Sequence, residues 1–261
     1  GRKITNLYSR RYNTPGKEIL RTENLKGIRF RNVTINVREG EIVSLSGLVG
    51  AGRTEVAKAL FGYDPIEGGE YYLFGKKVKQ SNPQQCVKLG MALLPEDRKN
   101  EGLFLRMPVK ENIVAASLKK LFKNGIVQSN KEVITAQKYK NELRIATPDI
   151  HKLVGELSGG NQQKVVVGKW LATDCKLFIF DEPTRGIDVG AKAEIYQLLD
   201  DLASKGAGIL MISSEMNEVI GLSDRVYVMR DGEVVKEFDR TELSQEAILT
   251  YAIAEGGKQN E

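Results

Sequence analysis

Short apolar runs alternate with amphipathic segments along most of the chain. Over residues 18–37, apolar and β-branched positions alternate loosely with polar ones, which predicts strands of a β-rich subdomain. A buried strand is predicted over 41–46, and it runs directly into glycines and a helix that ends at Gly62. Apolar strands at 177–180 and 208–212 flank a predicted helix with one apolar face. Strands that alternate with helices predict an α/β fold with a parallel sheet.

Residues 100–150 differ from the rest because their apolar positions follow a helical period. Helices are predicted over 110–122 and 129–145, the second opened by a capping box of Ser129 and Glu132. We interpret this segment as a helical insert. Further helices through 165–170 and 195–202, and a hairpin over 226–238, complete the predicted elements.

The two ends of the chain are interpreted differently from its middle. Residues 1–17 are polar and basic, which predicts a linker or N-terminal tail. Residues 18–240 are expected to form the main domain, with a helical subdomain at about 100–160, and 241–261 a C-terminal tail. The chain begins with Gly rather than Met, which favours a piece of a longer protein.

Composition excludes several classes of protein without naming a function. Hydrophobic residues make up 41% and charged residues 28% of the 261 residues, which is typical of a soluble globular protein rather than a disordered or disulfide-rich one. The apolar runs are far shorter than the roughly 20 residues of a membrane span, and no signal peptide is visible, so we expect a cytosolic protein. The net charge of +5 is scattered, and the basic cluster at 2–11 predicts a solvated tail or linker rather than a nucleic-acid arm. Cys86, Cys175 and the single histidine, His151, predict no metal site.

The strongest local signal is a glycine-rich turn between a predicted strand and a predicted helix. It reads Gly47-Leu48-Val49-Gly50-Ala51-Gly52-Arg53-Thr54. Glycines let successive backbone N–H groups point at phosphate oxygens, and the helix N-terminus favours an anion. Thr54 would supply a hydroxyl ligand to Mg²⁺. Arg53 stands where lysine is usual, and its planar guanidinium does not replace a compact ammonium group. An ordinary glycine-rich turn is the alternative interpretation.

Two carboxylates follow the apolar run at 177–180. A buried strand that ends at Asp181 can hold Mg²⁺ there, and Glu182 could polarise an attacking water. The alternative is a strand end followed by an ordinary acidic turn.

A third signal reads Leu157-Ser158-Gly159-Gly160-Asn161-Gln162-Gln163-Lys164, just before a predicted helix. Ser158 is a favourable N-cap, and the two glycines leave backbone N–H groups open to an anion. A single small site does not need two phosphate-facing loops, so they are expected to face different nucleotides or different subunits.

These three motifs, in this order and spacing, resemble those of an ATP-binding-cassette (ABC) ATPase over roughly residues 18–238. The finer sequence resembles the second cassette of the tandem ATPase subunit of ribose- or galactose-type monosaccharide importers, where two cassettes share one chain. The matching segments are GLVGAGRTE at 47–55, PEDRKNEGL at 95–103, LSGGNQQK at 157–164, DEPTRGIDVGAK at 181–192 and SSEMNEV at 213–219. Residues 2–16 would then link the two cassettes.

The resemblance implies a P-loop NTPase fold with a mostly parallel sheet core, an antiparallel β subdomain and a helical subdomain. It also implies that two cassettes close head to tail, with each ATP between the Walker motifs of one and the signature of the other. Gly47 to Glu55 would bind the ATP phosphates, Thr54 and Asp181 would hold Mg²⁺, and Glu182 would be the general base. Leu157 to Gln162 would form the signature that contacts the partner's ATP, and Asp188 occupies the D-loop position.

Three departures from the family pattern affect the chain's own site. Arg53 replaces the phosphate-binding lysine, Glu96 stands at the Q-loop glutamine, and Ser214 stands at the switch histidine. Loss of one preorganised donor to a transition state costs about 10²–10³ in rate. We therefore expect a division of labour: the chain gives its partner a competent signature, while its own site binds nucleotide and hydrolyses it slowly. Phe30 is a candidate to stack on adenine, although a core position is the interpretation we favour.

The resemblance further implies partners and a location. A first ABC cassette, a membrane permease docking beside residues 90–125 and, indirectly, a sugar-binding protein would surround a peripheral subunit at the cytoplasmic face of the membrane. A nucleic-acid ATPase is disfavoured because no zinc CxxC pair or long coiled coil is visible. A regulatory nucleotide-binding module with little or no hydrolysis is the rival function. The transported sugar is not encoded in an ATPase.

Overall fold

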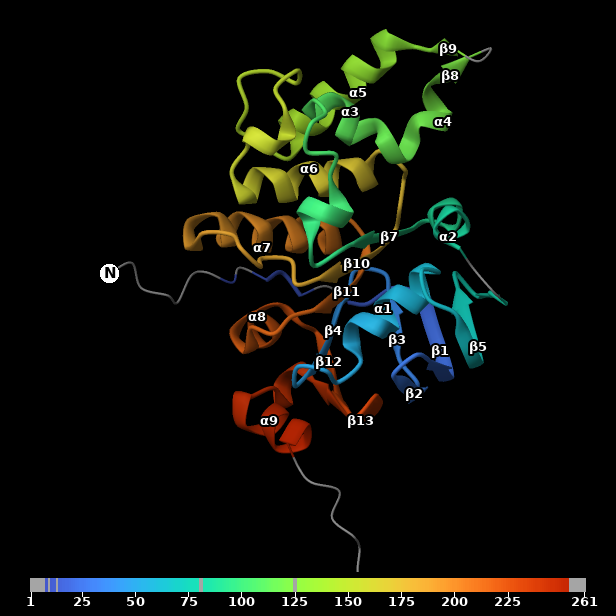
Figure 1. Ribbon diagram of the computed structural model, residues 1–261. Coiled ribbons are helices and arrows are strands. Elements are labelled where there is room, and N and C mark those ends of the chain that lie inside the picture. Colours follow the sequence, from blue (N-terminus) through green and yellow to red (C-terminus); the bar gives the residue numbers. More distant parts are fainter. Residues whose placement is uncertain (1–7, 9, 13, 80–81, 124–125, 254–261) are drawn as a thin grey trace, which may run out of the picture.

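The larger sheet of this computed structural model, which describes residues 8, 10–12, 14–79, 82–123 and 126–253, has the strand order β13-β12-β4-β11-β10-β7 (Figure 1). Neighbours from β12 to β7 pair in parallel, and only the β12–β13 hairpin within this sheet is antiparallel. The mostly parallel core is therefore confirmed. Its strands are β4 (Ile42–Gly47), β7 (Met91–Leu94), β10 (Leu177–Asp181), β11 (Gly208–Ile212), β12 (Arg225–Arg230) and β13 (Glu233–Asp239).

A second sheet is built from the N-terminal strands and is antiparallel, as expected. Phe30 begins one of its strands and is only 3% exposed, so its ring belongs to the core and is not open to stack on a base. The strands are β1 (Glu18–Gly27), β2 (Phe30–Val33), β3 (Asn36–Arg38), β5 (Ile66–Leu73) and β6 (Lys76–Lys77).

The predicted helical segment lies at one end of the molecule, above α6 (Gly159–Leu171) in Figure 1. The predicted helix at 110–122 is wrong as a single element. It divides into α3 (Val109–Val114), a 3₁₀ turn (Ala115–Ser117), α4 (Leu118–Leu121) and the start of a small hairpin of β8 (Phe122–Lys123) and β9 (Ile126–Val127). The Ser117 hydroxyl donates to the Val114 carbonyl at 3.2 Å, an i−3 bond that suits the tighter turn.

The predicted capping box is also wrong. Helix α5 (Ser129–Glu142) already includes Ser129, and Gln128 occupies the N-cap position without a side-chain hydrogen bond. The Glu132 carboxylate instead pairs with Lys110 of α3 at 3.5 Å. A tertiary ion pair has thus replaced the local interaction that the sequence pattern predicts.

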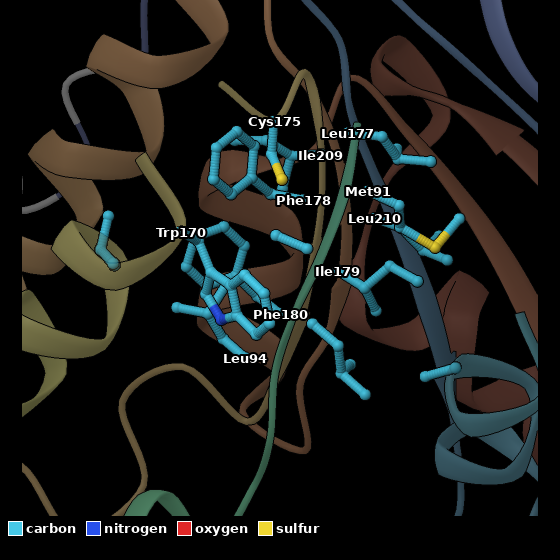
Figure 2. Packing of buried hydrophobic residues seen from close by; sticks show 14 of the residues in the cluster. Met91, Leu94, Trp170, Cys175, Leu177, Phe178, Ile179, Phe180, Ile209 and Leu210 are labelled. Carbon is cyan, nitrogen blue, oxygen red and sulfur yellow. The ribbon is translucent and has the colours of Figure 1, made fainter. Parts of the chain in front are cut away.

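Every residue of β10 is buried, and its side chains alternate between the two faces of the sheet. Phe178 and Phe180 lie on one face near Trp170 of α6, with their ring centroids 6.3 Å apart, and Ile179 lies on the other (Figure 2). Trp170 also meets Phe61 of α1 (Arg53–Phe61) edge to face at 5.8 Å. This packing fixes α1 and α6 against the sheet, so the loops that precede both helices have defined positions.

The remaining helices cover the sheet faces and the C-terminal hairpin. They are α2 (Pro83–Leu89), α7 (Val189–Ser204), α8 (Met216–Leu222), α9 (Gln245–Ile253), a π-helical turn (Arg98–Gly102) and 3₁₀ turns at Val154–Glu156 and Arg240–Glu242. The expected tail thus contains a helix, because Ile248 and Ala252 of α9 are buried against the hairpin. Among the described residues, we find no helix with the length and hydropathy needed to cross a membrane.

The N-terminal segment departs from the solvated tail that its composition predicts. Arg10 is buried, and its guanidinium pairs with Asp200 of α7 at 3.0 Å and with Asp224 at 2.6 Å. Burial of a paired arginine fixes this part of the chain to the domain. Residues 1–7, 9 and 13 of the expected linker lie outside the described residues, and the linker role stays a prediction.

Candidate functional site

A cleft of about 640 Å³ lies at the edge of the larger sheet where β4 and β10 end. The two strands flank β11, whose Ile212 is in register with Leu45 of β4 and with Asp181 of β10. Parallel strands deliver their carboxyl ends to one edge, which is why motifs far apart in sequence meet here. The cleft is lined by Val49, Gly50, Ala51, Gly52, Arg53, Thr54, Glu55, Glu96, Glu182, Thr184, Arg185, Gly186, Ile187, Lys192, Ser214 and Glu215.

The glycine loop (residues 47–54) has a backbone that only glycine tolerates at two of its positions. Gly47 has φ +149°, and a Cβ there would lie 2.2 Å from the Met229 carbonyl oxygen. Gly52 has φ +95° and precedes α1 without a side-chain cap. The first N–H groups of α1 are therefore left for another acceptor, and an anion fits that position. Val49 at the loop tip is 94% exposed.

Thr54 lines the cleft, and Asp181, which is buried beside it, forms with it a pair of oxygen ligands. Asp181 is 3% exposed, and its Oδ1 atom is buried without a hydrogen-bond partner. Burial raises the pKa of Asp181 to about 6, against the lowering effects of the Thr54 hydrogen bond and the Arg53 charge. An unpartnered carboxylate oxygen beside a hydroxyl fits the oxygen-ligand preference of Mg²⁺, which takes few protein ligands and completes its shell with phosphates and water.

Glu182 follows Asp181 in a strained backbone conformation. Its φ of +49° lies in the left-handed region, which costs of order 1–3 kcal/mol for a residue with a side chain. Ser214, on the segment after β11, donates from its hydroxyl to Glu182 Oε2 at 3.0 Å. The residue at the expected switch position therefore orients the expected general base.

Arg53 does not lie free in the cleft. It is 8% exposed, and its Nη1 donates to the Ser213 carbonyl at 3.0 Å. Burial lowers the pKa of Arg53, while the nearby charges of Glu182 and Asp181 act in the opposite direction. One arm of the guanidinium is thus committed to the segment that carries Ser214.

Glu96 lines the cleft and has a partner, Arg185, that the sequence does not reveal. Its carboxylate pairs with the Arg185 guanidinium, and both residues line the cleft. The negative charge that Glu96 brings to the expected Q-loop position is therefore paired with a positive one. No local signal could have revealed this pair, because the two residues come from different motifs that only the fold brings together.

The signature (Leu157 to Gln162) is absent from the lining of this cleft. Ser158 occupies the N-cap of α6, as predicted, but makes no capping bond, and its Oγ accepts from the Asn161 amide at 2.9 Å. A Cβ on Gly160 would lie 2.7 Å from the Ala191 Cβ, so glycine is required for α6 to pack on α7. Leu157 and Gln162 are buried within the chain. The first N–H groups of α6 are thus open to an anion outside the cleft.

Arg98 connects the signature to the turn after Glu182. Arg98, another residue that the sequence analysis did not single out, donates to the carbonyls of Arg185 at 2.6 Å and Gly186 at 3.1 Å. A Cβ on Gly159 would lie 2.7 Å from its Nη2 atom. Asp188, at the expected D-loop position, caps α7 by accepting from the Ala191 N–H at 3.0 Å.

Comparison with known proteins agrees with this arrangement. The family model described as ABC transporter matches residues 30–185. The chain belongs to the ABC transporter family. The ATP-binding proteins of ABC transporters are ATPases.

The relatives of this ABC cassette include sugar importers. The ribose import ATP-binding protein of Oceanobacillus iheyensis is 45% identical over 259 residues, which cover 98% of this chain and 52% of that protein. The xylose import ATP-binding protein of Thermoanaerobacter pseudethanolicus is 45% identical over 267 residues, covering 99% and 52%. The chain thus spans about half the length of the curated relatives it matches.

Solved ABC cassettes share the fold. A nucleotide-free ATP-binding cassette from an ABC transporter superposes with a TM-score of 0.76 at 24% identity, covering 92% of this chain and 100% of that one. A cassette in its ADP conformation gives a TM-score of 0.73 at 24% identity, covering 90% and 95%. The P-loop NTPase fold of an ABC cassette is therefore established for this chain.

Proposed function

We propose that this cassette couples ATP binding and hydrolysis to the import of a monosaccharide through a membrane permease. The observation that carries the proposal is the cleft, where the glycine loop and Glu182 meet at one sheet edge. Asp181 is buried beside Thr54 there, and Ser214 is hydrogen-bonded to Glu182. The ribose and xylose import proteins among its relatives support a sugar as the cargo. Their greater length supports a second cassette in the same subunit, of which this chain would be the C-terminal half.

In this proposal the glycine loop, Thr54, Asp181, Glu182 and Ser214 each have a defined task. The N–H groups of residues 47–54 bind the β- and γ-phosphates, and the dipole of α1 adds to the attraction. Thr54 and Asp181 would hold Mg²⁺, which supplies charge neutralisation at the phosphates. Glu182 accepts the proton of the attacking water. Ser214 keeps the Glu182 carboxylate in one orientation through its 3.0 Å hydrogen bond.

The signature serves a different ATP from the one in the chain's own cleft. Its glycines and the uncapped start of α6 lie outside the cleft, so only a second cassette could place a nucleotide against them and against its own glycine loop. The Arg53 guanidinium is hydrogen-bonded to the Ser213 carbonyl. Ser214 offers a short hydroxyl at the switch position, where the imidazole of a histidine would reach farther. The chain's own site is accordingly the slower of the two.

A groove of about 970 Å³ between the helical segment and the sheet supports the permease interface. It is lined by aromatic and aliphatic side chains together with lysines, the mixture that suits a peptide segment from a membrane protein. Residues 115–120 of this groove fall within the expected docking region at 90–125. The cassette would thus sit at the cytoplasmic face of the membrane as a peripheral subunit.

The decisive test compares two substitutions in the complete transporter. Ser158→Arg blocks the signature that serves the partner's ATP, whereas Arg53→Ala affects only the slow site. We expect Ser158→Arg to lower ATP-dependent sugar uptake into vesicles by about 10²-fold, and Arg53→Ala to lower it far less. Gly68→Ala, at a glycine where a Cβ meets only ordinary contacts, is the control. The opposite ranking would contradict the division of labour.

A regulatory half with little or no hydrolysis is the second candidate function. The contact between Arg53 and the Ser213 carbonyl favours it, because that cation is then not free for the phosphates. Equilibrium binding of Mg-ATP by the chain, combined with turnover in the complete transporter, separates the two. Stoichiometric binding, together with a residual turnover of the Ser158→Arg transporter that Glu182→Gln leaves unchanged, would favour the regulatory function.

A further inference from the structure

A buried carboxylate that the proposed mechanism does not use lies directly behind the switch residue. Glu218, in the first turn of α8, is 1% exposed. It accepts hydrogen bonds from the Ser213 hydroxyl and the Tyr196 hydroxyl, each at 2.7 Å, and from the Thr184 hydroxyl. A carboxylate so deeply buried is costly unless its donors are held in place, so the network orders all of its members.

The donors come from the segments that carry the catalytic groups. Thr184 lies two residues after Glu182, and Ser213 directly precedes Ser214. The Ser213 carbonyl also accepts from Arg53 at 3.0 Å, and its hydroxyl accepts from the Glu215 N–H at 3.0 Å. Glu218 thus connects, through hydrogen bonds, the two segments whose side chains meet in the Ser214–Glu182 hydrogen bond.

Tyr196 extends this network to the N-terminal segment. The Tyr8 ring stacks on the Tyr196 ring with centroids 4.9 Å apart and planes 29° from parallel. The same ring covers Gly221 of α8, where a Cβ would lie 2.5 Å from Tyr8 Cγ. Figure 1 shows the blue N-terminal trace running between α7 and α8, and the buried Arg10 anchors it to both sides.

We propose that Glu218 is a positioning residue for hydrolysis, which fixes Ser214 relative to Glu182 through Ser213 and Thr184. Tyr196 joins this network to Tyr8, so the segment that would lead to the first cassette is connected to the switch. The effect on turnover rests on the proposed function, whereas the ordering of the two segments rests on the geometry alone. Glu218 itself lies behind the cleft and touches no nucleotide.

The test compares Glu218→Leu, which removes both acceptor oxygens and shortens the side chain by one atom, with Glu218→Gln, which keeps one acceptor oxygen and the side-chain length. Glu246→Leu, at an exposed position of α9, is the matched control. Hydrogen exchange of the chain should become about tenfold faster in residues 182–187 and 213–216 of the Leu variant and stay unchanged in strand 91–94. In the complete transporter that also carries Ser158→Arg, where the remaining turnover comes from this chain's own site, kcat should fall about tenfold while the KM for ATP stays within about threefold, with the Gln variant intermediate.

Several results would overturn the proposal. Unchanged exchange in both segments of a folded Glu218→Leu protein would do so, as would an increase spread evenly over the chain, which marks a merely structural role. If Glu218→Leu does not fold, Tyr196→Phe keeps the stack on Tyr8, removes one donor and should give a smaller increase in the same two segments. If the wild-type transporter shows no ATP turnover but Glu218→Leu gives the local exchange pattern, the proposed function is refuted and the ordering role of Glu218 is supported.

Discussion

The buried carboxylate of Asp181 should lower the free energy of unfolding of the cassette. Its carboxylate must be ionised to hold Mg²⁺, yet it lies in a poorly solvated position with one unpartnered oxygen. Asp181→Asn keeps the shape and removes the charge. We expect the variant to lose Mg-ATP binding and to gain stability when nucleotide and metal are absent.

The pKa of Asp181 sets the size and the sign of this effect. A folded-state pKa of about 6 against an ordinary value of 3.8 makes the ionised side chain cost about 3 kcal/mol of folding free energy at pH 7.5. Because the folded-state pKa is the higher one, this cost is absent well below pH 3.8, grows as the pH rises from 3.8 to about 6, and is nearly complete above that value. At pH 4 the cost is only about 0.5 kcal/mol.

Urea unfolding of the wild-type chain and Asp181→Asn at both pH values measures the difference directly. Groups that do not interact with Asp181 titrate equally in both proteins, so the change in the difference reports on Asp181 and its immediate neighbours. Asp231→Asn, whose side chain is 89% exposed, is the control and should stay within about 0.5 kcal/mol of wild type. A stability gain that is equal at pH 4 and pH 7.5, or no gain at all, would refute the reasoning.

Two further predictions concern the anchoring of the N-terminal segment by Arg10 and the backbone of the glycine loop. Asp200→Ala leaves Arg10 buried with one partner lost and should lower the free energy of unfolding by about 3 kcal/mol or more in urea. Asp201→Ala, at a half-exposed neighbour, should cost less than about 1 kcal/mol, and equal losses would contradict the account. Gly47→Ala places a Cβ against the Met229 carbonyl, so nucleotide binding in a fluorescence titration should disappear while Gly68→Ala binds normally. Wild-type affinity in Gly47→Ala would show that the loop backbone is not the phosphate site.

Local patterns were enough to predict the elements that carry the motifs. The strand at 177–181 is a continuous apolar run ending in a carboxylate, and Gly62 and Gly206 mark helix ends, so each prediction needed only neighbouring residues. The β12–β13 hairpin around Asp231-Gly232 follows the same logic. Strand β7 was not predicted, because its four apolar residues have no period that distinguishes a strand from a helix.

Contacts between distant segments could not be predicted from the sequence. Arg53 was recognised as a departure, but its bond to the Ser213 carbonyl depends on the register of β4 and β11. The Glu96–Arg185 pair and the Arg98 contacts likewise require the fold. Glu132 was assigned to a local cap and instead pairs with a lysine of another helix. Tertiary contacts determine the positions of such side chains, because each local hydrogen bond or ion pair contributes only about 1 kcal/mol.

The central claim is that the cleft and the signature of one chain belong to two different ATP sites. Mixing a Glu182→Gln chain with a Ser158→Arg chain tests it most directly, since only a mixed dimer can pair an intact Glu182 with an intact signature. With random pairing, half of the dimers are mixed and each has one competent site, so about a quarter of wild-type ATP turnover should return. Turnover that stays at the level of the separate variants, while the wild-type chain is active at the same concentration, would contradict the account.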